Sequence, residues 1–153
     1  MLIAEYAADS LNAALYEIVP EIPYTDADLA YYTGGRADKE QNDDSARPAI
    51  SGEVSGMREY DTIILGYPIW HGQAPRIIST FLESYDFSGK TIVPFCTSHS
   101  SGIGSSATNT DTHITMQAVG PQPIYRHFIP TVQKYRFALE IKHANLPDTI
   151  CGL

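Results

Sequence analysis

Two short apolar segments with an amphipathic segment between them limit most strongly what this chain can fold into. Asp61-Thr-Ile-Ile-Leu-Gly-Tyr67 and Lys90-Thr-Ile-Val-Pro-Phe-Cys96 are continuous apolar runs, as buried parallel strands are. Residues 74–85 lie between them and carry apolar side chains at helical spacing: Ile77, Ile78, Phe81 and Leu82. Strand, helix and strand within this length predict a βαβ unit with two parallel strands and a right-handed crossover.

The rest of the chain extends this unit less clearly. Residues 2–13 have helical periodicity, residues 15–19 alternate like a short strand, and Pro20 ends that strand. Residues 20–58 are polar, rich in Pro, Gly and Asp, and show no sustained period, which predicts a long connection of the kind that often carries function. Pro94 lacks an N–H, so its strand is expected at a sheet edge or with a local bulge. The predicted class is α/β with the three strands parallel.

Charge and composition exclude several kinds of protein. Residues 1–61 hold 13 Asp/Glu and 4 Lys/Arg, whereas residues 62–153 hold 5 and 6. The acidic half argues against nucleic acid as a partner, and it is either a solvated face or a surface that attracts a basic redox partner. No apolar stretch is long enough to cross a membrane, and the start lacks the basic region of a signal peptide. The two cysteines and five histidines show no disulfide or metal-ligand spacing, so a cytoplasmic protein without a metal site is expected.

Both strands of the βαβ unit end in loops suited to a ligand, because ligands of open α/β sheets bind beyond the carboxyl ends of the strands. The first loop offers an aromatic ring and free backbone amides; its candidate residues are Pro68, Ile69, Trp70, His71 and Gly72. The second loop is small enough for close backbone approach; its candidates are Thr97, Ser98, His99, Ser100, Ser101, Gly102 and Gly104. Trp70 either stacks on a flat ligand ring or caps the core beneath the loop, and the residues alone leave both readings open.

Several motifs in order resemble the short bacterial flavodoxin-like family. They are Leu15 to Thr25, Asp43 to Ile50, Tyr60 to Trp70, Ala74 to Phe95, and Thr97-Ser98 followed by Ser101-Gly-Ile-Gly104. The resemblance implies an open, doubly wound parallel sheet of flavodoxin type with non-covalent flavin mononucleotide (FMN). It also implies that the two candidate loops border the isoalloxazine ring, and that the protein shuttles electrons or acts as a reductase.

The chain departs from that family in two places. The family opens with an apolar strand and a phosphate-binding loop, which this chain is expected to lack, so its sheet should be incomplete, with unpaired strand edges inside it. FMN binding is then expected to be weak. From residue 107 the resemblance fades, which predicts a flavodoxin-like domain at 1–106 and a poorly packed divergent tail at 107–153.

Two other functions stay open at this stage. Ser98-His-Ser-Ser-Gly102 follows a strand, as the nucleophile of a serine hydrolase does, with Ser100 as nucleophile and His113 or His127 as base. The chain could also be a non-functional remnant or a non-catalytic binding module. Flavin colour in the purified protein would favour the FMN hypothesis over both.

Overall fold

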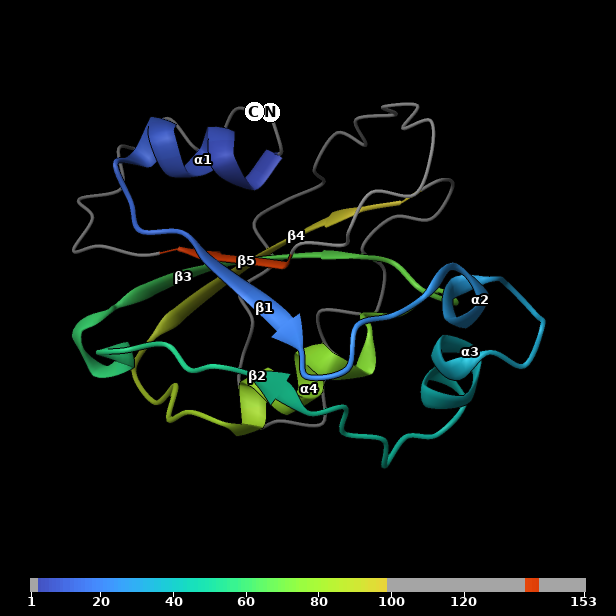
Figure 1. The fold of residues 1–153 in the computed structure, drawn as a ribbon. Coiled ribbons are helices and arrows are strands. Elements are labelled where there is room, and N and C mark those ends of the chain that lie inside the picture. Colours follow the sequence, from blue (N-terminus) through green and yellow to red (C-terminus); the bar gives the residue numbers. More distant parts are fainter. Residues whose placement is uncertain (1–2, 99–136, 141–153) are drawn as a thin grey trace.

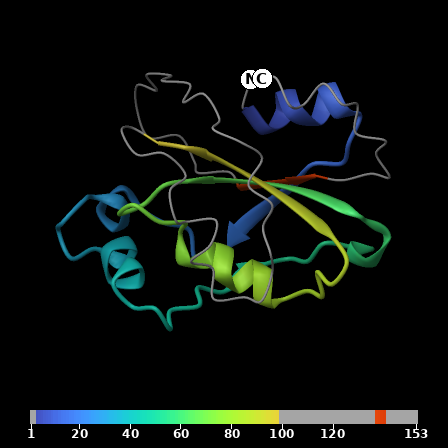
Figure 2. The same ribbon diagram turned by 180° about the vertical axis from the view of Figure 1, so that it is seen from behind.

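Residues 3–98 and 137–140 are described by the computed structural model, and they form a five-stranded sheet with the order β2-β1-β5-β3-β4. The strands are β1 (Tyr16–Pro20), β2 (Ile50–Ser51), β3 (Thr62–Pro68), β4 (Thr91–Thr97) and β5 (Phe137–Glu140). The helices are α1 (Ile3–Leu11), α2 (Asp26–Leu29), α3 (Arg36–Gln41) and α4 (Arg76–Glu83), with a short 3₁₀ helix at Met57–Glu59. Helix α1 covers one face of the sheet and α4 the other (Figures 1 and 2). The α/β class is thus confirmed.

The predicted βαβ unit is present and forms the best-buried part of the molecule. Strands β3 and β4 pair in parallel along their whole length, from Thr62 opposite Thr91 to Pro68 opposite Thr97. The apolar face of α4 packs on them; the side chains that meet there and are almost fully buried are Ile63, Leu65, Ile77, Ile78, Phe81, Leu82 and Ile92. Burial of each stabilises the fold by about 1.5–3 kcal/mol relative to exposure. Strand β4 ends the strand order of the described sheet, which accommodates Pro94 as expected.

Strand β5 lies where an unpaired gap was expected, and that expectation was wrong. Its residues pair antiparallel with β1 on one side and with β3 on the other. Strands β1 and β3 therefore run in the same direction, as predicted. Open N–H and C=O groups on two neighbouring edges can be satisfied by a strand of either direction, and a segment from the far end of the chain supplies one. The rest of residues 107–153, and the expected domain boundary at 106, lie outside the described residues.

The long connection contains short elements that periodicity could not reveal. Helix α2 has only four residues and begins with a capping box, in which Thr25 N–H donates to Asp28 Oδ2 at 2.8 Å and Asp28 N–H donates to Thr25 Oγ1 at 3.2 Å. Strand β2 adds a two-residue antiparallel pairing to β1. Helices α2 and α3 lie together at the end of the sheet where β3 finishes (Figure 1). The connection thus brings its side chains to the first candidate loop.

Candidate functional site

The carboxyl ends of β3 and β4 lie side by side. Pro68 is opposite Thr97 in the parallel ladder, and the N–H of Ile69 donates to the carbonyl oxygen of Thr97 at 2.9 Å. The two candidate loops therefore start from adjacent points of one sheet edge. Of the second loop, Thr97 and Ser98 are described, whereas His99, Ser100, Ser101, Gly102 and Gly104 lie outside the described residues.

The first loop is a tight turn, and His71 at its tip has a positive φ although it is not a glycine. Trp70 and Gln73 exchange two backbone hydrogen bonds, each of 2.9 Å. His71 (φ 50°) and Gly72 (φ 79°) between them both adopt the left-handed conformation, as the central residues of a type I′ turn do. The N–H groups of His71 and Gly72 donate to no atom of residues 3–98 or 137–140, and a Cβ added at Gly72 would meet nothing within 4 Å. The turn thus keeps two backbone donors available beside open space.

Trp70 is packed into the molecule. Only 6% of its surface is exposed, and its ring meets Tyr24 edge-on with the ring centres 5.3 Å apart. The Tyr24 hydroxyl donates a very short hydrogen bond to Glu40, and the Arg36 guanidinium lies 3.7 Å from the Tyr24 ring centre. Burial and the Glu40 bond raise the pKa of Tyr24 far above its usual value, against the lowering effect of Arg36. This packing agrees with the reading of Trp70 as a cap on the core, and a stacking role for it stays a prediction.

Gln41 of α3 holds the first loop in position. Its side-chain amide donates to the carbonyl oxygens of Trp70 at 3.1 Å and Ala74 at 3.2 Å, and its Oε1 accepts from the N–H of Arg76 at 3.0 Å. Sequence reasoning missed this residue. The available signal was weak: Asp38 and Gln41 lie three residues apart in a polar segment, so both can reach the same side of a helix.

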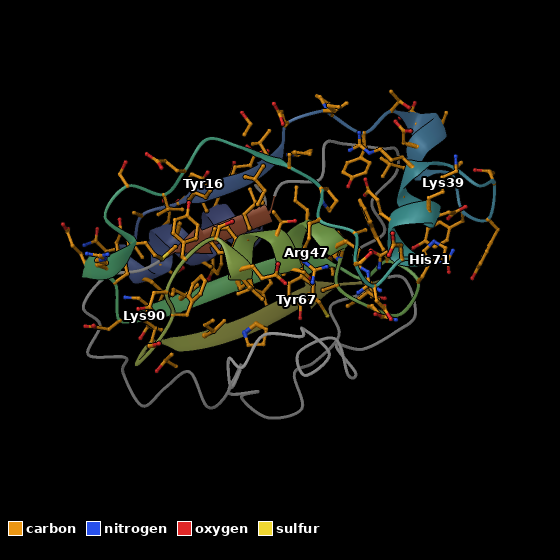
Figure 3. All side chains as sticks on the ribbon, turned by 90° about the horizontal axis from the view of Figure 1, so that it is seen from below. Tyr16, Lys39, Arg47, Tyr67, His71 and Lys90 are labelled. Carbon is orange, nitrogen blue, oxygen red and sulfur yellow. The ribbon has the colours of Figure 1, made fainter. Side chains whose placement is uncertain are left out.

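Asp38 ties the tip of the first loop to the long connection. One carboxylate oxygen lies 2.8 Å from Nε2 of His71, and the other accepts from the N–H of Gly34 at 2.9 Å. Burial is the largest single influence on the Asp38 pKa and raises it. The hydrogen bonds from Gly34, Tyr32 and Thr33, together with the His71 charge, outweigh burial and lower the Asp38 pKa overall. Figure 3 shows His71 at the same end of the molecule as Lys39 of α3.

A small hollow with room for about one water molecule adjoins this pair. Its lining residues are Leu29, Tyr31, Ala37, Asp38, Trp70 and His71. Side chains of α2, α3, the first loop and the segment between the two helices thus converge on one point, and those of Tyr31, Asp38, Trp70 and His71 are polar or aromatic. The chemistry available there is hydrogen bonding to a ligand edge, ring stacking and proton exchange through an imidazole–carboxylate pair.

The other sequence hypotheses gain little from the described residues. Ser100, His113 and His127, proposed for a hydrolase, lie outside them. Arg47, a basic residue of the long connection, pairs with Glu83 at 2.7 Å. Within residues 3–98 and 137–140, no group of three or more His, Cys, Asp or Glu side chains could hold a metal ion. None of the helices in these residues has the length and apolar character needed to span a membrane.

Comparison with known proteins places the chain in a family. The model of a family described as flavodoxin matches residues 1–125. A presumed flavoprotein from Bacteroides uniformis is 41% identical, with a TM-score of 0.70 over 74% of this chain and 76% of that one. A presumed flavoprotein from Bacteroides eggerthii is 44% identical, with a TM-score of 0.64 over 67% of each chain. No functionally curated protein matches the chain. The chain belongs to the flavodoxin family.

Proposed function

We propose that this protein binds FMN at the carboxyl ends of β3 and β4 and works in electron transfer or flavin-dependent reduction. The observation that carries the proposal is the first loop. Its His71 and Gly72 N–H groups have no acceptor in the described part of the chain, and they lie directly beyond a buried parallel strand. Family membership and the two flavoproteins of similar fold support the same cofactor.

The residues present fit the edge of a flat polar ring. A flavin edge carries carbonyl oxygens and ring nitrogens, which accept hydrogen bonds from backbone N–H groups. Gly72 leaves open space at the turn, and the hydrogen bond from Ile69 to Thr97 keeps the first residue of the second loop next to the first loop. Residues 68–72 and residues from Thr97 to Gly104 would hold the ring, with Trp70 beneath the turn. Bound FMN would supply the redox chemistry, and the protein would bind and orient it.

The described residues offer the phosphate few cations. A phosphate is held by cations or clustered N–H donors. Among the described residues at this end, Arg36 is engaged with Glu40 at 3.1 Å and Arg76 with Asp44, whereas Lys39 of α3 lies at the same end as His71 (Figure 3). We therefore expect FMN to bind with modest affinity, and only slightly more tightly than riboflavin, which lacks the phosphate.

Two matched variants test the proposal. Gly72 and Gly89 both have positive φ, 79° and 74°, and both have open space where a Cβ would go. Gly72 follows β3, whereas Gly89 precedes β4 at the opposite end of the unit. Gly72→Val and Gly89→Val should lose similar stability, because a β-branched residue is strained at positive φ.

Flavin fluorescence, titrated with each protein, separates the two variants. Gly72→Val should weaken flavin binding about tenfold, or about 1.4 kcal/mol, because the valine side chain would fill the open space beside the two N–H donors, and Gly89→Val should leave it unchanged. Equal effects of the two variants, or no flavin binding by the unmodified chain at millimolar concentration, would refute the proposed site.

A further inference from the structure

Three rings form a compact group at the tip of the first loop, here called the aromatic corner: Tyr31, Tyr32 and His71. Tyr31 stacks on His71 with the ring centres 5.0 Å apart and the planes at 28°. Tyr32 meets His71 edge-on at 5.2 Å, and the two tyrosine rings lie 5.9 Å apart. Residues from two distant segments of the chain are thus brought into one cluster beside the proposed flavin loops.

The aromatic corner is held in an unfavourable backbone conformation. Tyr32 has a φ of 57° and His71 a φ of 50°, a region in which side chains other than glycine are uncommon. Asp38 stabilises both segments, since its carboxylate accepts from the N–H of Gly34 and contacts Nε2 of His71. Backbone strain of this kind persists where the surroundings enforce it, and it concentrates at binding sites.

The corner is also open to solvent and lies in an acidic part of the chain. Tyr31 is 56% exposed and Tyr32 is 84% exposed, although both rings are large and apolar. Residues 21–44 hold seven Asp/Glu and two Lys/Arg. The Asp38 carboxylate lies 2.8 Å from the His71 ring, so this pair carries no net positive charge even when His71 is protonated.

We propose that the aromatic corner binds a planar, positively charged heteroaromatic ring of the pyridinium type. The faces of tyrosine rings are negative and attract cations, and flat rings stack on them. Asp38 and the net negative charge of residues 21–44 favour a cationic ring over an anionic one. The role of such a ring as redox substrate rests on the proposed function, because it would lie next to the flavin loops; its binding does not depend on flavin.

The test uses the unmodified chain without flavin and a matched pair of probes. Methyl viologen carries two pyridinium cations, and 4,4′-bipyridine has the same two rings without the charges. Binding is followed through the ring proton signals of the tyrosines and histidines in nuclear magnetic resonance spectra. Methyl viologen should shift the signals of the aromatic corner, and 4,4′-bipyridine should bind at least twofold more weakly. Added salt should weaken only the binding of the cation.

Two variants locate the site. Tyr32→Leu removes the most exposed ring and should weaken methyl viologen binding roughly two- to fivefold. Tyr6→Leu is its control, because Tyr6 is 65% exposed on α1, away from the loop. Equal losses in the two variants, equal affinity for the two probes, or no binding of methyl viologen at millimolar concentration would each overturn the proposal. Flavin titration of the same samples is scored separately, so failure of one proposal does not count against the other.

Discussion

Strand β3 has two neighbours, and they differ in almost every respect. On one side β4 pairs in parallel through all seven residues of each strand. On the other side β5 pairs antiparallel through three residues of β3, Ile64 to Gly66. The β4 side is joined to β3 by a short crossover that contains α4, whereas β5 is distant in sequence. One strand is thus held by a strong local pairing and a weak distant one.

The difference shows what each pairing depends on. The β3–β4 pairing follows from contacts close in sequence and from the apolar face of α4, which buries side chains of both strands. The β5 pairing satisfies backbone groups of β1 and β3 that would otherwise lie unpaired inside the sheet. Gly66 is paired on both sides, with Phe95 of β4 and Ala138 of β5. Substitutions of these three neighbouring residues therefore test both pairings.

The largest effect is expected on the β4 side, from Gly66→Ala. A Cβ at Gly66 would overlap the ring of Phe95. Overpacking of this kind costs about 1–3 kcal/mol, which urea denaturation can measure. The double variant Gly66→Ala with Phe95→Leu should recover part of the loss, because leucine lacks the overlapping ring atoms, and Phe95→Leu alone is the control. If the stability losses of the two single variants simply add in the double variant, residues 66 and 95 do not contact each other.

A smaller effect is expected on the β5 side, from Ala138→Pro. Proline removes one N–H from the middle of β5, a loss of about 1 kcal/mol. Ala138→Ser keeps the N–H and serves as control. Amide hydrogen exchange should rise in β1 and along the β5 side of β3, while the amides of β4 stay protected. A rise of equal size in β4 would mean that the two sides of β3 do not behave separately.

The same contrast explains how much of the fold could be predicted from sequence. The unit β3–α4–β4 was predicted because its apolar periods lie within one short stretch, where spacing alone specifies the pairing. Strand β5 was not predicted, because Phe137–Glu140 has only four residues, and the residues of β1 and β3 with which it pairs lie more than 70 positions away. A pairing that fills a gap between strands leaves no periodic signal of its own.

The candidate site likewise has one part that the sequence predicted and one part that it did not. The loop after β3 was predicted from its place at a strand end, and Trp70 and His71 do lie there. Asp38 and Gln41, which hold that loop, were missed, because they belong to the connection at 20–58, whose six-residue helix is too short to show a period. Long-range hydrogen bonds between polar side chains and a loop are specified by the tertiary fold, and a single sequence does not reveal them.

The smallest effect is expected when the pH is lowered, which should weaken the contacts of Asp38 and leave the β3–β4 pairing intact. The pKa of Asp38 is lower in the folded chain than its usual value of about 3.9, since three N–H groups and His71 together outweigh the effect of burial. A carboxyl group whose pKa is lowered by folding stabilises the fold above its unfolded pKa, and that contribution disappears as the pH falls through the lower, folded value.

Below about pH 4, the contact between residues 30–35 and the tip of the first loop should therefore loosen first. The amide of Gly34, which donates to Asp38, should then exchange faster, while the amides of β3 and β4 stay protected because the backbone pairing of the two strands does not depend on pH in this range. Asp38→Asn removes the titrating group, so the exchange rate of Gly34 should no longer have its own step in this range. Glu83 and Asp86 also have lowered pKa values through Arg47 and Ser88, and they remain as an internal reference for acid effects elsewhere in the chain. Simultaneous loss of protection at Gly34 and throughout β3 would show that the fold unfolds cooperatively in acid and that Asp38 does not stabilise one region independently of the rest.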